Sequence, residues 1–238
     1  MKLLVFQHIA CEHPGIFRSF LKEDGIAWDA VELDAGEAIP ALDGYDMLWV
    51  MGGPMDVWDV EEHPWLVAEK KAIRHWVRDL GKPYLGFCLG HQLLADALNG
   101  TCGPQRPPEI GILNVDLTKA AAADPVFSAL PQHFKALQWH SVRVAQAPED
   151  AVILARSDIC PVQALRIGRH AYSMQYHVEL EPDTIPNWGC VPAYEQALAA
   201  ARGAGALAAL AKEAEPLMAG FIADARTLYR GFMKVAGV

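Results

Sequence analysis

The sequence has no apolar run long enough for a membrane span, no paired C-x-x-C cysteines and no dense run of lysine and arginine. A spanning helix needs about 18 or more apolar residues, so no membrane association is expected. Structural zinc sites commonly use paired cysteines, so no metal centre is expected either. Phosphate binding needs clustered positive charge, and the formal net charge of −9 argues against a nucleic-acid partner.

Five cysteines are present, an odd number without a close pairing pattern, which favours reduced thiols and a cytoplasmic location. Four of them, Cys11, Cys102, Cys160 and Cys190, are interpreted as ordinary thiols. The first residues, MKLLVFQHIACEH, lack the long apolar region and cleavage site of a signal peptide and favour a strand. The chain also lacks a phosphate-binding G-x-x-x-x-G-K-[ST] loop and a glycine-rich pyrophosphate turn, so no organic cofactor is expected.

The first hundred residues alternate short apolar runs with amphipathic segments. This alternation predicts an α/β fold with a parallel sheet covered by helices on both faces. Strands are expected at 2–7, 27–33, 46–51 and 82–87, and helices at 16–24, 63–80 and 91–99.

The pattern changes after residue 110. Short strands are expected at 111–117, 141–144, 151–155, 161–167 and 170–179, with a helix near 124–131. The Ala-rich tail predicts helices at 193–203 and 205–235. We expect residues 1–182 to form one domain and residues 183–238 to form a helical extension packed on it.

The stretch Gly86-Phe87-Cys88-Leu89-Gly90 has the form G-x-C-x-G between a predicted strand and a predicted helix. A nucleophile held on a sharp strand-to-helix turn needs this pattern, because a Cβ two residues before or after it would clash. The helix N-terminus would also favour the thiolate form of Cys88. Taken alone, the motif is also consistent with Cys88 as a small buried hydrophobic residue.

A nucleophilic cysteine needs a base and a group that orients the base, and QYHVE supplies both. On an extended strand His177 and Glu179 lie two residues apart and share a face. Taken alone, this pair could equally bind a metal or form a surface ion pair. Gly52 and Gly53 follow another predicted strand and could present a backbone N–H to an oxyanion, although glycine pairs after strands are common turns.

Together, MGGPMD, GFCLGHQ and QYHVE resemble the segments that carry the glutaminase of class I (triad) glutamine amidotransferases. Two further segments, EIG at 109–111 and QWHS at 138–141, are similar to pocket-lining segments of that family. The resemblance covers residues 1 to about 182. It is greatest to the free-standing group similar to the glutaminase half of GMP synthetase.

The resemblance implies a flavodoxin-like, mostly parallel sheet and a division of roles among the residues of the three segments. Cys88 would be the nucleophile, His177 the acid and base, and Glu179 the group that orients His177. The backbone N–H groups of Gly53 and Leu89 would bind the oxyanion. The residues expected to contact the substrate are Gln92, Gly52, Trp139 and His140.

Two departures from the family pattern concern the histidines. Residue 178 is Val where many relatives have Pro, which leaves the strand able to form a hydrogen bond at that position. No acid follows His140 by two positions, so His140 could be a pocket residue or a structural one. His91 is interpreted as packing at the start of its helix.

Three functions remain open from the sequence. The first is cysteine-dependent hydrolysis or transfer of a γ-glutamyl amide, either glutamine or another γ-glutamyl compound, through a thioester on Cys88. The second is a glutaminase subunit that delivers ammonia to a separate synthetase. The third is a non-catalytic scaffold, which the complete set of triad residues argues against. The expected partners are a small-molecule substrate and, in the second case, a synthetase subunit. The extension could cover the entrance to the site or form a homodimer surface.

Overall fold

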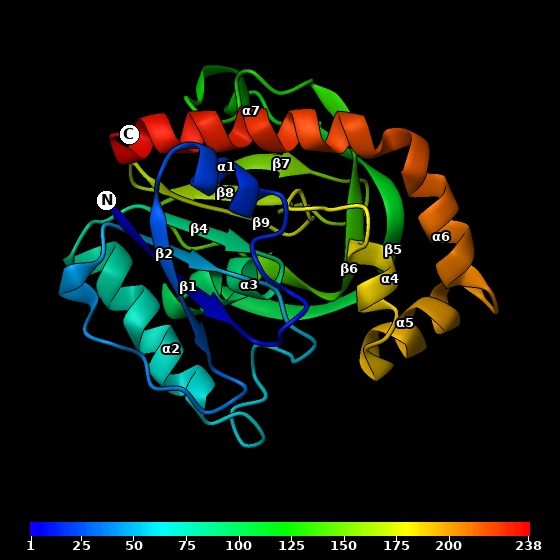
Figure 1. Cartoon of the computed structure of the whole chain (residues 1–238), viewed down its shortest axis with the longest axis horizontal. Coiled ribbons are helices and arrows are strands. Elements are labelled where there is room, and N and C mark those ends of the chain that lie inside the picture. The colour runs from blue at the N-terminus through cyan, green and yellow to red at the C-terminus, as the bar shows by residue number, and fades with distance from the viewer.

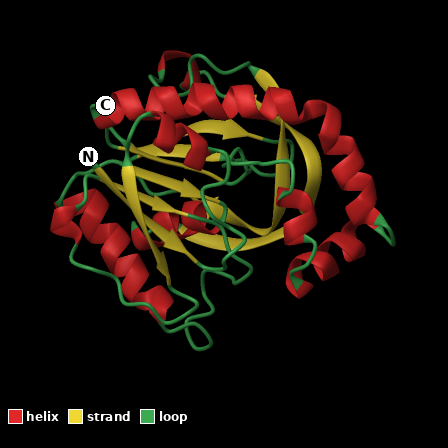
Figure 2. Ribbon diagram, in the orientation of Figure 1, coloured by secondary structure: helices red, strands yellow, loops and turns green.

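A nine-stranded sheet with helices on both faces forms the centre of the computed structural model, which describes residues 1–238 (Figures 1 and 2). The strand order is β2-β1-β3-β4-β9-β8-β7-β5-β6. The strands are β1 (Lys2–Gln7), β2 (Ala27–Glu32), β3 (Met47–Val50), β4 (Tyr84–Phe87), β5 (Thr101–Leu117), β6 (His133–Gln146), β7 (Ala151–Arg156), β8 (Ala164–Ile167) and β9 (Ala171–Met174). The strands β2, β1, β3, β4 and β9 pair in parallel with their neighbours in this group. The pairings β9-β8, β8-β7, β7-β5 and β5-β6 are antiparallel. The predicted α/β class is confirmed.

Successive residues of the central strands enter opposite cores, as the two-residue period of a strand requires. Leu3 and Val5 of β1 pack in one core, and Leu4 and Phe6 pack in the other. The first core is covered by α1 (Phe17–Glu23) and α7 (Met218–Ala236). The second is covered by α2 (Trp65–Arg74) and α3 (Leu89–Ala97).

The C-terminal helices run beside β5 and β6 and then back across one face of the sheet to α1 (Figure 1). They are α4 (Thr184–Trp188), α5 (Pro192–Arg202), α6 (Ala206–Ala214) and α7. A third hydrophobic cluster joins residues of α4, α5 and α6 to Leu137 and Trp139 of β6. No helix of this fold combines the length and the hydropathy needed to cross a bilayer.

Three local expectations were wrong. Residues 124–131 form turns rather than a helix, because Asp124 accepts hydrogen bonds from Val126 and Phe127 over a single turn that does not propagate. The helix expected over 205–235 is interrupted by a 3₁₀ turn at Glu215–Leu217, where Pro216 cannot donate a backbone hydrogen bond. The last strand ends at Met174 rather than Glu179.

We propose that residues 1–182 and 183–238 unfold as one cooperative unit. The ring of Phe232 in α7 is fully buried and lies 6.3 Å, between ring centroids, from both Trp49 and Tyr172 of the sheet. Phe232→Ala should therefore lower the free energy of unfolding by about 3–5 kcal/mol. Urea unfolding followed by circular dichroism and by tryptophan fluorescence should show one coincident transition. Arg230→Ala, at an exposed position of the same helix, is the matched control. Two separated transitions would contradict the proposal.

Candidate active site

Cys88 sits at the sharp turn between β4 and α3 with a strained backbone. Its φ of 47° and ψ of −101° lie outside the regions that non-glycine residues normally occupy. A Cβ added at Gly86 would lie 2.8 Å from the carbonyl oxygen of Gly90, so the close approach expected across the turn is present. The Cys88 N–H donates to the carbonyl of Met174, 2.9 Å away, which ties the turn to β9.

His177 and Glu179 face the same site although they lie beyond the end of β9. The His177 N–H donates to the carbonyl of Leu137 at 2.9 Å, so a single bridge to β6 keeps this segment extended. Nδ1 of His177 lies 2.6 Å from Oε1 of Glu179, and both side chains are buried. Oε2 of Glu179 accepts a hydrogen bond from the Val178 N–H at 2.8 Å, a bond that Pro at position 178 could not make.

The protonation of Cys88 and His177 is coupled. Burial raises the pKa of the Cys88 thiol, and a hydrogen bond with His177 opposes this rise without cancelling it. Burial lowers the pKa of His177, but the Glu179 carboxylate and the bond with Cys88 outweigh it and hold that pKa well above its ordinary value. The sequence favoured a thiolate from the helix N-terminus alone, whereas in the structure burial dominates at the sulfur. His177 is the group that can draw the thiol proton.

Two backbone donors beside Cys88 are unused. Neither the Gly53 N–H nor the Leu89 N–H donates a hydrogen bond within the protein. Leu89 is the first residue of α3, so its N–H is one of those that a helix leaves without an internal acceptor. Both residues line the same cavity as Cys88. Free N–H groups at this position are the donors that an oxyanion requires.

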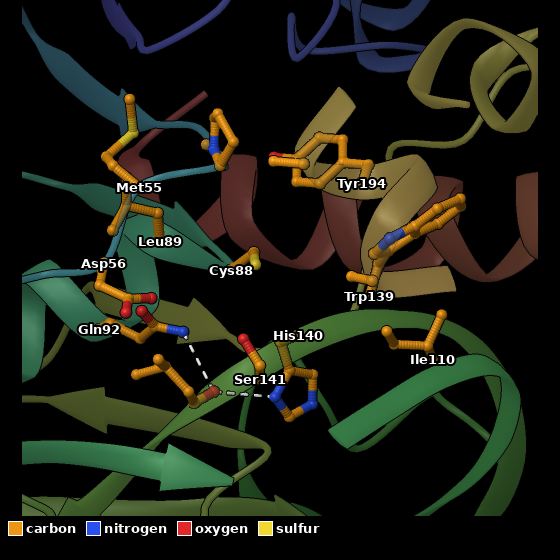
Figure 3. A pocket seen from close by; sticks show the side chains of 15 residues that line it. Met55, Asp56, Cys88, Leu89, Gln92, Ile110, Trp139, His140, Ser141 and Tyr194 are labelled. Carbon is orange, nitrogen blue, oxygen red and sulfur yellow. Dashed lines mark hydrogen bonds between the residues drawn. The ribbon is translucent and has the colours of Figure 1, made fainter. Parts of the chain in front are cut away.

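Figure 3 shows this cavity, with Met55 and Leu89 on one side of Cys88 and Trp139 and Tyr194 on the other. Gln92, Trp139 and His140, expected at the substrate, all line it. Gly52 is not among the lining residues, because its Cα faces Glu12 and a Cβ there would lie 1.8 Å from Glu12 Oε2. The cavity walls come from Gly53, Pro54, Met55, Asp56, Cys88, Leu89, Gln92, Ile110, Trp139, His140, Ser141, Val142, Ala193, Tyr194 and Ala197.

Gln92 connects the cavity wall to Cys88 through Gln175. Its amide nitrogen donates to the carbonyl of Val142 and to Oε1 of Gln175, both at 3.2 Å. The amide nitrogen of Gln175 in turn lies 3.6 Å from the sulfur of Cys88. Gln175 is a site residue that sequence reasoning missed, although it stands two residues before His177.

The acid that His140 lacks in its own strand comes from the neighbouring strand. Glu109 of β5 is paired with His140 of β6, and its carboxylate lies 3.1 Å from Nε2 of His140. Nδ1 of His140 donates to the carbonyl of Val142 at 2.8 Å. His140 is therefore both a cavity residue and a hydrogen-bonded one. No cluster of three or more His, Cys, Asp or Glu side chains in the structure is arranged to hold a metal ion.

Glu12 is a second site residue that the sequence did not single out. It follows β1, is buried, and accepts a hydrogen bond from the Tyr194 hydroxyl of α5. Its Oε2 has no partner and lies against Gly52. Burial raises the pKa of Glu12 to about 7, with His177 opposing the rise and Glu179 adding to it. No local sequence signal marks a lone glutamate in a loop as part of a site.

These features bring a strained cysteine, a buried His–Glu pair and two free backbone N–H groups together in an α/β fold. The chain belongs to the family described as glutamine amidotransferase class-I, whose model matches residues 18–185. The family resemblance seen in the sequence is thereby confirmed.

Related proteins extend this assignment. The glutamine amidotransferase-like protein YfeJ of Salmonella typhimurium is 29% identical over 210 residues, 85% of each chain. Gamma-glutamyl peptidase 5 of Arabidopsis thaliana is 29% identical over 175 residues, 71% of this chain and 68% of the peptidase. GMP synthase of Aeropyrum pernix is 34% identical over 165 residues, 67% of this chain but only 30% of the synthase. A crystal structure of a glutamine amidotransferase from Thermotoga maritima has the same fold, with a TM-score of 0.87 at 23% identity over 100% of this chain and 99% of that one.

The raised pKa of Glu12 predicts a pH-dependent stability. The folded protein binds this proton more tightly than the unfolded chain, whose carboxyl has the ordinary value of 4.5. The resulting stability is present below pH 4.5 and is lost as the pH rises through about 7. In Glu12→Gln the side chain stays neutral. The stability of wild type relative to this variant should therefore fall by about 2–3 kcal/mol between pH 5 and pH 8.

Urea unfolding at the two pH values measures this difference. Glu62→Gln, at an exposed position, should show no such change and is the control. An equal pH response of wild type and Glu12→Gln would mean that Glu12 is ionised throughout this range.

Proposed function

We propose that this protein hydrolyses or transfers γ-glutamyl amides, glutamine or another γ-glutamyl compound, through a γ-glutamyl thioester on Cys88. The observation that carries the proposal is the strained Cys88, whose pKa is raised by burial and lowered by the neighbouring His177, with His177 itself held 2.6 Å from Glu179. Because Nδ1 of His177 faces Glu179, Nε2 is the nitrogen left for the sulfur. Nucleophile, base and orienting carboxylate thus have the arrangement that acyl transfer requires.

The chemical steps follow from these positions. The sulfur attacks the γ-carbonyl carbon while its proton passes to His177. The oxyanion that forms accepts hydrogen bonds from the N–H groups of Gly53 and Leu89. The intermediate collapses as the C–N bond breaks, and the amine departs with the proton from His177. Water, or another acceptor, then gives its proton to His177, attacks the thioester carbon and releases the glutamyl product and the free thiol.

Two features favour a catalyst that acts alone. The extension supplies part of the cavity wall, since Tyr194, Ala193 and Ala197 all come from α5. The similarity to YfeJ and to the Arabidopsis gamma-glutamyl peptidase covers most of this chain. The alternative, a glutaminase subunit that supplies ammonia to a separate synthetase, is favoured by the 34% identity to the Aeropyrum GMP synthase.

A substrate screen separates these two functions. The purified protein is incubated with glutamine and with a panel of γ-glutamyl peptides and amines, and the release of amine or ammonia is measured. Turnover without any other protein supports the independent hydrolase. Ammonia release that begins only when a synthetase-containing fraction is added supports the subunit.

The role of Cys88 is tested by covalent labelling. A glutamine analogue with an electrophilic diazo group should label wild type and Cys190→Ala, whose exposed thiol lies outside the cavity, but not Cys88→Ala. Mass spectrometry locates the adduct. Labelling that persists in Cys88→Ala would point to another thiol as the nucleophile.

The roles of His177 and Glu179 are tested by turnover. His177→Ala should lower kcat by several orders of magnitude, as losses within catalytic triads generally do. Glu179→Gln should cost less, because its amide oxygen can still orient the imidazole. Small and equal losses of kcat in the two variants would mean that His177 and Glu179 form an ordinary buried ion pair without a catalytic role.

A further inference from the structure

We propose that His8, held by Glu69, is a positioning residue that locks the Gly52–Gly53 peptide with its N–H toward the oxyanion. The inference rests on the proposed function and extends it. It assigns a role to a buried ion pair that takes no part in the chemical steps above.

The geometry at His8 fixes the direction of one peptide group. His8 follows β1, and its Nδ1 lies 2.8 Å from the carbonyl oxygen of Gly52. A carbonyl oxygen only accepts, so Nδ1 carries a proton and donates it. The peptide between Gly52 and Gly53 is trans, since the single cis bond of the chain is Arg106-Pro107. Across a trans peptide the N–H points opposite to the C=O, so the Gly53 N–H points away from His8.

That N–H has no acceptor in the protein, and Gly53 lines the cavity beside Cys88. Glycine places few limits on its own backbone, so a Gly-Gly peptide can rotate at small cost unless another group holds it. Rotation would turn the Gly52 carbonyl toward the developing oxyanion and remove one donor. The hydrogen bond from His8 opposes that rotation.

The rest of the arrangement fixes His8 itself. Nε2 of His8 lies 2.9 Å from Oε1 of Glu69 in α2, and both side chains are fully buried. The indole of Trp65 stacks on the imidazole at 5.5 Å, with 14° between the planes. Burial lowers the pKa of His8, but Glu69 outweighs it and raises that pKa overall.

Packing alone does not call for this ion pair. Glu69 lies on the apolar face of α2 with Leu66 and Ile73, where a leucine would continue the hydrophobic contact. A buried ion pair is often no more stabilising than apolar residues of similar volume. The Glu69 carboxylate at this position is explained by its contact with the His8 ring, which donates a hydrogen bond to the Gly52 carbonyl.

The experiment compares three variants of the full chain with wild type. His8→Leu removes the donor. The double variant His8→Asn with Glu69→Leu keeps a donor at the Nδ1 position without leaving a buried, unpaired carboxylate. His63→Leu is the matched control, because His63 also contacts Trp65 but forms no bond to Gly52.

We expect kcat of His8→Leu to fall by about tenfold to a thousandfold, the upper value being the loss of a full oxyanion donor. Its KM should change by less than about threefold, because the donor acts mainly in the transition state. Alkylation of Cys88 by iodoacetamide forms no oxyanion and should keep its rate. The double variant should recover most of kcat, and His63→Leu should match wild type.

Two further readouts make the test decisive. Crystal structures of His8→Leu and of the double variant show directly whether the Gly52 carbonyl has turned toward the cavity. The proposal is overturned if His8→Leu keeps both kcat and the wild-type peptide orientation, or if the double variant folds without recovering turnover. If wild type cleaves no γ-glutamyl amide, the proposed function fails, and the peptide orientation in the variants still decides the role of His8. Should His8→Leu fail to fold, the double variant and its crystal structure carry the test.

Discussion

The strained turn at Cys88 is the constraint on which the rest of the site depends. A residue with a φ of 47° in this setting stays there only if its surroundings hold it. Hydrogen bonds to Met174 of β9 and from the Gly90 N–H to Met51, directly after β3, attach both sides of the turn to the sheet. The parallel order β3-β4-β9 therefore does more than build a core. It brings the Gly-Gly turn, Cys88 and His177 to the carboxyl ends of three adjacent strands, where such sheets bind ligands.

The parts of this site that the sequence could predict are those that local patterns encode. Glycines flanking a cysteine, apolar alternation and helical periodicity each act over a few residues, so the α/β class and the Cys88 turn could be inferred directly. The pairing of His177 with Glu179 was predicted from a strand that in fact ends at Met174. The two side chains nevertheless share a face, because the bridge between His177 and Leu137 keeps the backbone extended there.

What could not be predicted depends on partners far apart in the chain. Glu109 reaches His140 only through the register of two antiparallel strands, and Glu69 reaches His8 only because α2 covers β1. Glu12 meets Tyr194 across 182 positions of sequence. In the linear sequence each of these carboxylates looks like a solvated surface charge. Its burial, on which its role depends, is a property of the tertiary structure. The break at Pro216 is a local signal, because proline has no N–H to donate within a helix, and the prediction of one helix over 205–235 did not take it into account.

The C-terminal helices change what the site can be used for. Trp188 of α4 packs edge to face against the His177 ring, with 4.5 Å between the ring centroids, and the Tyr194 hydroxyl of α5 donates to Glu12. A docked partner can activate a site only by changing groups that are not already fixed. Here His177 packs against a helix of its own chain, and the Gly52 carbonyl accepts a hydrogen bond from His8, whose ring is held by Glu69. Both restraints are intramolecular, so a docking partner would have little left to organise. The same physical features that complete the site internally therefore favour a catalyst whose substrate, rather than a second subunit, enters beside α5.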